Sequence, residues 1–108
     1  MTDILPYLER IRARFDEPEM QASFRGFART IQFIFTDLSR NFVLNIAEDG
    51  TATLAEQTVP QPDIKVTTTS DTLADILDRK LNPVHAYATR KIKATGKMDD
   101  LLRLQKLL

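Results

Sequence analysis

The sequence lacks cysteine and tryptophan altogether, and its 108 residues include one histidine and three glycines. Without cysteine there is no disulfide scaffold, no thiolate nucleophile and no cysteine-ligated metal site. The single histidine, His85, has no second histidine with which to share a metal ion, and no serine or aspartate motif surrounds it. Three isolated glycines cannot form a phosphate-binding loop. These absences predict a protein that is not an enzyme and that has neither a metal site nor a cofactor.

Long hydrophobic runs are also missing. No apolar segment approaches the roughly 18 residues that a membrane-spanning helix needs, and Met1-Thr2-Asp3 lacks the basic start and apolar stretch of a signal peptide. We therefore expect a cytoplasmic protein. A hydrophobic content of 43% with 28% charged residues is ordinary for a globular chain. The length predicts a single domain over residues 1–108.

Charge is unevenly distributed although the formal net charge is zero. Residues 41–78 contain seven acidic residues and one basic residue, whereas residues 79–98 contain no acidic residue and six basic ones: Arg79, Lys80, Arg90, Lys91, Lys93 and Lys97. Two interpretations stay open, a solvated face and a surface that meets anionic partners. The stretch RKIKATGK has no aromatic side chains on which bases could stack, so no nucleic-acid partner is expected.

Hydrophobic periodicity divides the chain into helices and strands. Apolar spacings of three and four predict helices over residues 2–15 and 16–28. From residue 30 the apolar residues alternate, which predicts three strands joined by short turns into an antiparallel meander up to about residue 56. Such alternation leaves one face of a sheet covered and the other wet.

The second half of the chain predicts two more strands and three more helices. A fourth strand lies within residues 63–69 and a fifth within residues 90–95, with two short helices between them and a final helix from residue 98 or 99 to residue 108. A strand, helix, strand connection favours a right-handed parallel pair. The predicted fold class is α+β, a five-stranded mixed sheet with about five helices packed on one face.

Residues 63–107 resemble the sterol carrier protein 2 family of lipid-binding and lipid-transfer domains. The resemblance rests on Lys80-Leu81-Asn82-Pro83 with an aromatic at Tyr87, followed by the pattern Lys91-Ile92-Lys93, Thr95-Gly96, Met98 and Leu104-Gln105. It extends more weakly over nearly the whole chain. It implies a sterol carrier protein 2-like fold with a hydrophobic cavity between sheet and helices, in which the C-terminal helix forms part of the wall. It also implies binding of fatty acids, acyl-CoAs, sterols or isoprenoid lipids without catalysis.

The chain departs from the eukaryotic pattern of that family in two ways. It ends in QKLL, without a peroxisomal Ser-Lys-Leu type signal, which agrees with the cytoplasmic expectation. Arg90 occupies a place where relatives often have glycine before the fifth strand.

Candidate ligand-binding residues are the apolar residues expected to face inward, together with one polar residue of the last helix. The predicted cavity lining comprises Phe33, Phe35, Phe42, Leu44, Ile46, Ile64, Val66, Leu73, Ile76, Leu77, Tyr87, Ile92, Met98, Leu101, Leu102 and Gln105. Each of the apolar residues has an alternative interpretation as ordinary core, because every half-buried sheet needs such alternation. Contacts with an anionic head group are predicted for Arg25, Arg29, Arg90 or Lys97.

The final helix carries five leucines among residues 101–108. Leu101, Leu104 and Leu108 share one side, Leu102 widens it, and Leu107 lies farther round. So wide an apolar stripe suits a helix that covers a lipid pocket, but a final core helix or a dimer contact would show the same pattern.

The sequence therefore predicts non-catalytic binding, and intracellular transfer, of a lipid in a cavity between sheet and helices. The alternative is an accessory or dimerising module that supports a lipid- or quinone-biosynthesis enzyme, with a small or vestigial pocket. The expected partners are a fatty acyl, acyl-CoA, sterol or isoprenoid ligand and a transient contact with anionic membranes. Both a monomer and a homodimer remain open.

Overall fold

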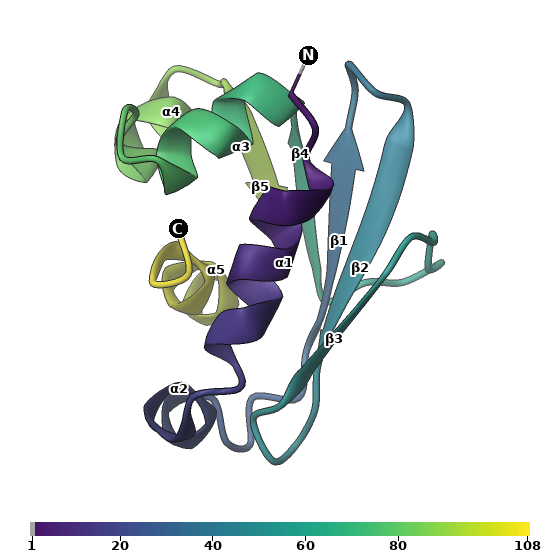
Figure 1. Ribbon diagram of the computed structural model, residues 1–108, viewed down its shortest axis with the longest axis vertical. Helices are drawn as coiled ribbons and strands as arrows, with labels where there is room; N and C mark the ends of the chain where they lie inside the picture. The colour runs from purple at the N-terminus through teal and green to yellow at the C-terminus, as the bar shows by residue number, and fades with distance from the viewer. Residues whose placement is uncertain (1) are drawn as a thin grey trace.

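The structure, a computed structural model, describes residues 2–108. Its helices are α1 (Leu5–Arg14), α2 (Pro18–Ser23), α3 (Ser70–Leu77), α4 (Pro83–Ala88) and α5 (Met98–Gln105). Its strands are β1 (Thr30–Phe35), β2 (Arg40–Ile46), β3 (Ala52–Ala55), β4 (Ile64–Thr68) and β5 (Ile92–Thr95). Figure 1 shows the helices together on one side of a twisted sheet, which confirms the predicted α+β architecture.

The strands form one mixed sheet in the order β3-β2-β1-β4-β5. The first three strands are the predicted antiparallel meander. The parallel pair is β1 with β4, whereas β5 runs antiparallel to β4. The predicted parallel pairing of the fourth and fifth strands is therefore wrong. The two short helices between these strands bring the chain back at the end where β4 finishes, so that Thr68 pairs with Ile92 and the strands run in opposite directions.

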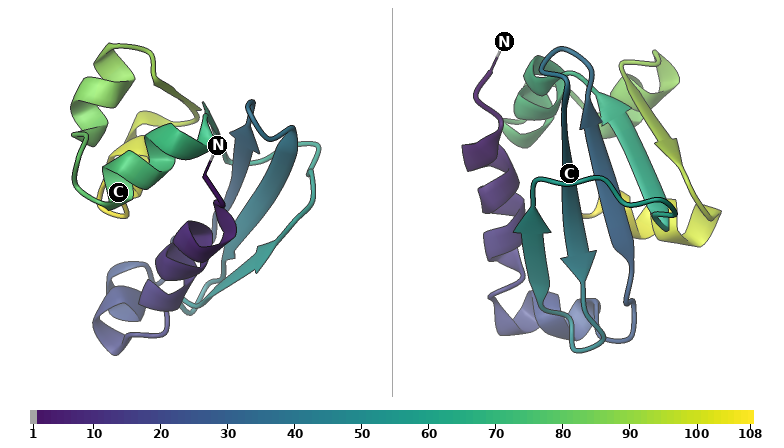
Figure 2. Two further views of the ribbon diagram at one scale, coloured as in Figure 1. Left: turned by 45° about the horizontal axis from the view of Figure 1, so that its top comes forward. Right: turned by 90° about the vertical axis from the view of Figure 1, so that its right-hand side faces the viewer.

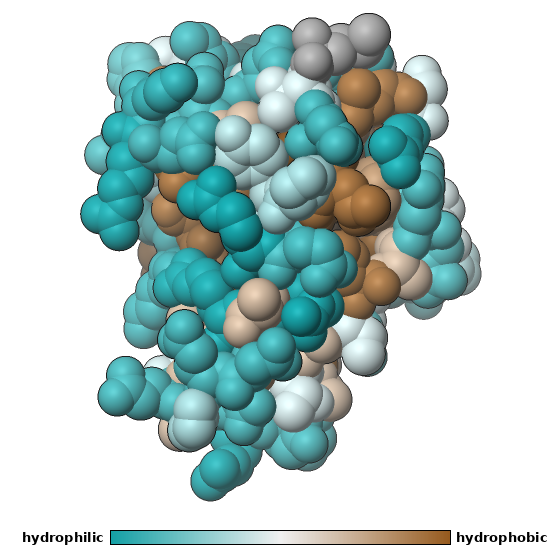
Figure 3. Space-filling view, viewed as in Figure 1, coloured by the Kyte–Doolittle hydropathy of each residue, from teal (hydrophilic) through white to brown (hydrophobic). Residues whose placement is uncertain are grey.

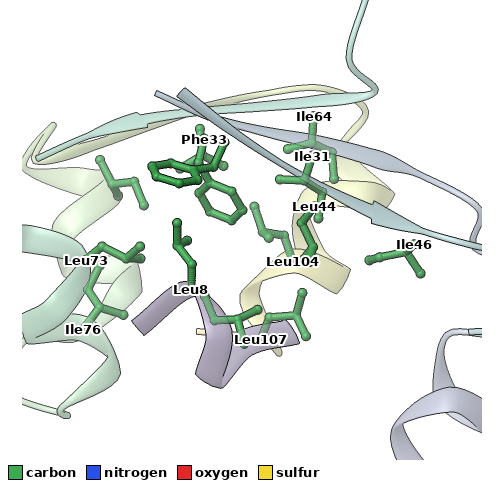
Figure 4. Packing of buried hydrophobic residues seen from close by; sticks show 14 of the residues in the cluster. Leu8, Ile31, Phe33, Leu44, Ile46, Ile64, Leu73, Ile76, Leu104 and Leu107 are labelled. Carbon is green, nitrogen blue, oxygen red and sulfur yellow. The ribbon is translucent and has the colours of Figure 1, made fainter. Parts of the chain in front are cut away.

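The core lies between the helices and the inward face of the sheet. Phe33, Phe35 and Leu44 point from the strands toward Leu8 of α1 and Leu73 of α3, and all five side chains are at most 1% exposed. Figure 4 shows how Leu8, Leu73, Leu104 and Leu107 converge on the strand residues from three different helices and the chain end. Among the described residues, no buried side-chain polar atom lacks a hydrogen-bond partner. The buried apolar residues of the helices and the central strands thus form one hydrophobic cluster.

The opposite face of the sheet is less wet than its alternating sequence predicts. The segment that connects β3 to β4 crosses this face, as the right-hand view of Figure 2 shows. Gln32 fastens the segment to β1, because its amide donates to the Gln57 carbonyl at 3.0 Å and accepts from the Val59 N–H at 2.9 Å. Val43 of β2 is consequently buried although its position in the alternation points away from the helices. The helices therefore occupy one face, and a loop partly covers the other.

No helix within residues 2–108 is both long and apolar enough to cross a membrane. The described part of the chain also brings together no group of three or more histidine, aspartate or glutamate side chains that could hold a metal ion.

Candidate lipid-binding groove

An apolar hollow of about 190 Å³ opens between α4, β5 and α5, and we call it the α4–α5 groove. Its lining consists of Pro83, Val84, Tyr87, Ile92, Ala94, Met98, Leu101, Leu102, Leu104, Gln105 and Leu108. Among these side chains, only the Tyr87 hydroxyl and the Gln105 amide are polar. The groove therefore offers an acyl or polyisoprenoid chain an almost wholly apolar surface with polar groups at two places.

The rim of the groove exposes large apolar side chains to solvent. Val84 and Tyr87 of α4 are 56% and 54% exposed, and Met98 and Leu102 of α5 are 68% and 55% exposed. These four are among the five exposed large hydrophobic residues of the described chain. Such a contiguous apolar surface on a small domain indicates a binding site for a ligand or partner.

α4 is held in place by local sequence signals. The Asn82 side chain accepts hydrogen bonds from the N–H groups of Val84 and His85, at 2.8 and 3.3 Å, and Pro83 occupies the first helical turn. Ala86 is fully buried and fixes one side of this short helix to the core. Val84 and Tyr87 therefore project from the other side toward the groove rim.

α5 is held from inside by two leucines and by an ion pair. Leu104 and Leu107 are 4% and 1% exposed, and the Arg29 Nε lies 3.0 Å from the Asp100 carboxylate. Asp100 is almost buried, and its position in the first turn of α5 also suits the positive end of the helix dipole. The helix thus presents Leu101, Leu102 and Gln105 to the groove while Leu104 reaches into the core.

The turn before α5 leaves no room for a side chain. Gly96 has a φ of +148°, and a Cβ added to it would lie 2.8 Å from the Asp63 carbonyl oxygen. This close approach lets β5 pass directly into α5, which brings the two walls of the groove together.

The structure divides the predicted lining residues into three sets. Six lie on the groove: Tyr87, Ile92, Met98, Leu101, Leu102 and Gln105. Eight lie in the packed core: Phe33, Phe35, Phe42, Leu44, Ile46, Ile64, Val66 and Leu73. Ile76 and Leu77 line a different hollow beside α1 and α3. The prediction that all sixteen contact a ligand remains a prediction, and the core set could do so only if the core opened.

Several groove residues were absent from the predicted set. Pro83, Val84, Ala94, Leu104 and Leu108 also line the groove. Ala94 follows Ile92 at the inward spacing of β5, and Leu104 and Leu108 lie on the predicted leucine stripe, so the sequence held a signal for these three. No periodic signal marks Val84, because α4 has only six residues.

The four predicted head-group residues lie in different surroundings. Arg29 is engaged with Asp100, with the Phe27 carbonyl at 2.8 Å and with the Phe27 ring. Arg25 is exposed beyond the end of α2, and Arg90 lines a polar hollow with threonines of β4. Lys97 is exposed and directly precedes Met98 on the groove. The structure therefore does not gather these residues into one site.

The fold and the groove define a small α+β domain with an exposed apolar hollow between its last strand, α4 and α5. The family comparison identifies the particular family, because residues 8–108 match the SCP-2 sterol transfer family. The chain belongs to this family, whose domains are in general lipid binders without catalytic function. A search of curated proteins finds no significant match.

Solved structures with a similar fold include part of an inverting sec-alkylsulfatase, a palmitated sterol carrier protein and a ubiquinone synthesis protein. The sulfatase Pisa1 from Pseudomonas sp. is 27% identical with a TM-score of 0.70, over 82% of this chain. The palmitated sterol carrier protein SCP2L2 from Aedes aegypti is 21% identical with a TM-score of 0.72, over 93% of this chain and 88% of its own length. The UbiJ-SCP2 ubiquinone synthesis protein is 12% identical with a TM-score of 0.67, over 99% of this chain and 93% of its own.

The match to the sulfatase covers a much smaller share of the matched protein than the other two matches do. This chain spans 14% of the length of that enzyme, so the likeness concerns one small part of a large protein. The two smaller proteins match over most of their length at low identity, and this shows a shared fold.

Proposed function

We propose that this domain binds the hydrocarbon chain of one lipid in the α4–α5 groove and carries it without chemical change. The main support for this proposal is the open apolar hollow, whose rim exposes Val84, Tyr87, Met98 and Leu102 to solvent. Membership of the SCP-2 sterol transfer family and the palmitated state of the Aedes aegypti relative support a fatty acyl ligand. An acyl-CoA, a sterol or an isoprenoid presents a similar apolar surface.

Hydrophobic burial supplies much of the free energy that this mode of binding needs. Each buried methylene contributes about 0.8 kcal/mol, so ten to twelve methylenes give roughly 8 to 10 kcal/mol before the entropy of ordering is subtracted. A micromolar dissociation constant corresponds to a net free energy of about 8 kcal/mol. Burial of the chain is therefore the main favourable contribution, and contacts with the head group add to it.

We expect α5 to move outward when a long chain binds, because the groove is smaller than most ligand pockets. Ligand pockets generally enclose about 300–1,000 Å³, whereas the groove has about 190 Å³. The inner side of α5 is attached mainly through Leu104, Leu107 and Asp100. An outward shift of this helix would extend the groove past Ile92 toward the core residue Ile64.

Native mass spectrometry of the protein purified from its own host tests the proposed function. We expect a monomer or homodimer that carries about one lipid per chain, and a delipidated sample that takes up palmitate with the same stoichiometry. A lipid-free obligate dimer that rejects palmitate would contradict lipid binding. That result would favour the alternative, an accessory module for a lipid- or quinone-biosynthesis enzyme.

We further propose that the groove rim touches anionic membranes transiently to exchange its lipid. The exposed cations Arg90 and Lys97 lie close in sequence to the exposed apolar residues Tyr87 and Met98. Apolar side chains flanked by cations suit the interface of an anionic bilayer. Liposome sedimentation should show stronger binding to vesicles with phosphatidylserine than to vesicles of phosphatidylcholine alone. Equal binding to both would contradict the membrane contact.

A further inference from the structure

A second, larger hollow of about 750 Å³ lies between α1, the end of α3 and the segment that leads into α4. We call it the basic hollow, because Arg10, Arg14, Arg79 and Lys80 line it and no acidic side chain does. In the view of Figure 3, hydrophobic surface shows between hydrophilic side chains in the gap that separates α3 and α4 from α5. The hollow therefore combines a cationic rim with apolar patches.

Two of the four cations are already committed to partners. Arg10 lies 3.2 Å from an Asp78 oxygen, and Arg14 donates to the Leu107 carbonyl at 3.0 Å. Arg79 and Lys80, by contrast, make no side-chain hydrogen bond or ion pair with any part of the chain that the structure describes. Neither of these two charges is thus in direct contact with an anion, although the charge of Lys80 also acts on the Asp78 carboxylate.

The backbone that carries these two free cations is well fixed. The Arg79 N–H donates to the Ile76 carbonyl at 3.1 Å and the Lys80 N–H donates to the Asp75 carbonyl at 2.8 Å, which closes α3 in a Schellman motif. This motif gives Arg79 a φ of +62°, in the region that normally favours glycine. Arg79 adopts this conformation although glycine would be less strained, and the residue lines the hollow.

The basic hollow and the α4–α5 groove are neighbours. Pro83 and Leu108 line both of them. An amphiphile whose chain lies in the groove therefore has a cationic surface within reach of its head. A phosphate carries more charge than a carboxylate and accepts several hydrogen bonds, so it matches an arginine and a lysine that lack partners.

We propose that the basic hollow binds the phosphate-bearing head of the lipid whose chain occupies the groove, with Arg79 and Lys80 as its main contacts. The inference rests on the proposed function, since it assigns a ligand class to the same site. Two kinds of ligand have this chemistry, a membrane lysophospholipid and an acyl-CoA. Both carry a phosphate group and a single hydrocarbon chain.

Competition binding tests the proposal with matched probes. Dodecyl phosphate and dodecanol have the same twelve-carbon chain and differ only in the head group. Each is titrated as a competitor of a bound fluorescent fatty acid. The assay compares the wild-type protein with two double variants, Arg79→Gln/Lys80→Gln and Lys65→Gln/Lys93→Gln. The last variant removes the same charge from exposed positions on strands β4 and β5 that alternate with the inward Ile64, Val66 and Ile92. We expect the wild type and this control to bind dodecyl phosphate about tenfold more tightly than dodecanol, through two charge-assisted contacts. Arg79→Gln/Lys80→Gln, which we call the hollow variant, should lose the preference for dodecyl phosphate and keep its affinity for dodecanol.

The outcomes separate this inference from the proposed function. If dodecanol binds and dodecyl phosphate keeps its preference in Arg79→Gln/Lys80→Gln, the basic hollow is not the head-group site although the groove binds lipid. If neither probe displaces the fluorescent fatty acid, lipid binding in the groove itself fails. Lauroyl lysophosphatidic acid and lauroyl-coenzyme A are then compared in the wild type and the hollow variant. A loss of affinity for either one identifies the source of the phosphate, and unchanged affinity for both contradicts the proposal.

Discussion

At the scale of single residues, Arg90 holds a backbone conformation that its side chain disfavours. It follows α4 with a φ of +62°, and its N–H and that of Lys91 close the helix on the carbonyls of Tyr87 and Ala86. A left-handed residue with a Cβ costs about 1 kcal/mol relative to glycine. The left-handed backbone conformation thus explains why relatives in the family that the sequence resembles often have glycine at this position.

Replacing Arg90 with glycine should therefore raise the free energy of unfolding by about 1 kcal/mol. Arg90→Ala is the matched control, because it removes the same long side chain and keeps the Cβ. Urea denaturation measures both variants. If the alanine variant gained as much stability as the glycine variant, the arginine side chain and not its backbone conformation would be the cause.

Asp37 makes the stability of the fold depend on pH. Its carboxylate accepts hydrogen bonds from the N–H and the hydroxyl of Ser70, at 2.9 and 2.5 Å, and so ties the β1–β2 turn to the start of α3. Burial acts to raise the pKa of Asp37, but the hydrogen bonds from Ser70 outweigh it and lower the pKa below its ordinary value. A lowered pKa in the folded state means that the carboxylate stabilises the fold above its unfolded pKa of about 3.9, and that this contribution disappears as pH falls through the folded value.

We accordingly expect Asp37→Asn to reduce the free energy of unfolding at pH 7 by about 1 to 2 kcal/mol. Denaturant titrations between about pH 2 and 5 should also show a shallower loss of stability in the variant than in the wild type. Some acid sensitivity should remain, because the pKa of Asp78 is also lowered, by hydrogen bonds from Tyr7 and Arg10. An unchanged pH profile would show that Asp37 does not carry this dependence.

At the scale of elements, one side of α5 packs into the core and the other side lines the groove. Leu104 is 4% exposed and packs into the core, whereas Leu102 is 55% exposed on the groove. The predicted stripe had placed Leu107 farther round the helix, yet Leu107 is 1% exposed. The helix ends at Gln105 and the chain then turns, so a helical wheel no longer describes where residues 107 and 108 point.

This division predicts opposite phenotypes for two leucines of α5. Leu102→Gln should weaken palmitate binding about tenfold, because part of the apolar wall is lost, and should change the free energy of unfolding by no more than about 0.5 kcal/mol. Leu104→Ala should reduce the free energy of unfolding by about 2 to 4 kcal/mol through a cavity in the core. Calorimetric titration and urea denaturation check both. A Leu102→Gln variant that binds palmitate like the wild type would remove α5 from the binding site.

At the scale of the whole molecule, the sequence predicted the composition of the layers better than their connections. Alternation in residues 30–56 correctly predicted the meander, since hairpin pairing depends on neighbouring segments. The pairing of β1 with β4 joins strands that are distant in the chain, and local spacing contains no information about it. The crossing segment that Gln32 fastens was missed for the same reason.

The division between core and groove also lay beyond the sequence. Phe33 and Ile92 both occupy inward positions of the sheet, yet Phe33 is 1% exposed under the helices and Ile92 borders the groove. Alternation predicts the face of the sheet to which a strand residue points. Whether a helix or an open groove lies above that residue depends on how the helices pack. Only the family resemblance pointed to a ligand, and the structure then showed where the open apolar surface lies.

Intermolecular nuclear Overhauser effects between uniformly ¹³C-labelled palmitate and the protein would show whether the lipid chain lies in the α4–α5 groove. We predict contacts from the palmitate chain to the side chains of Val84, Met98, Leu101 and Leu102 around the α4–α5 groove. We predict none to Leu8 of α1 or to Phe15 at its end, which are both buried in the core. A palmitate molecule bound with contacts to Leu8 and Phe15, and with none to α4 or α5, would contradict this prediction.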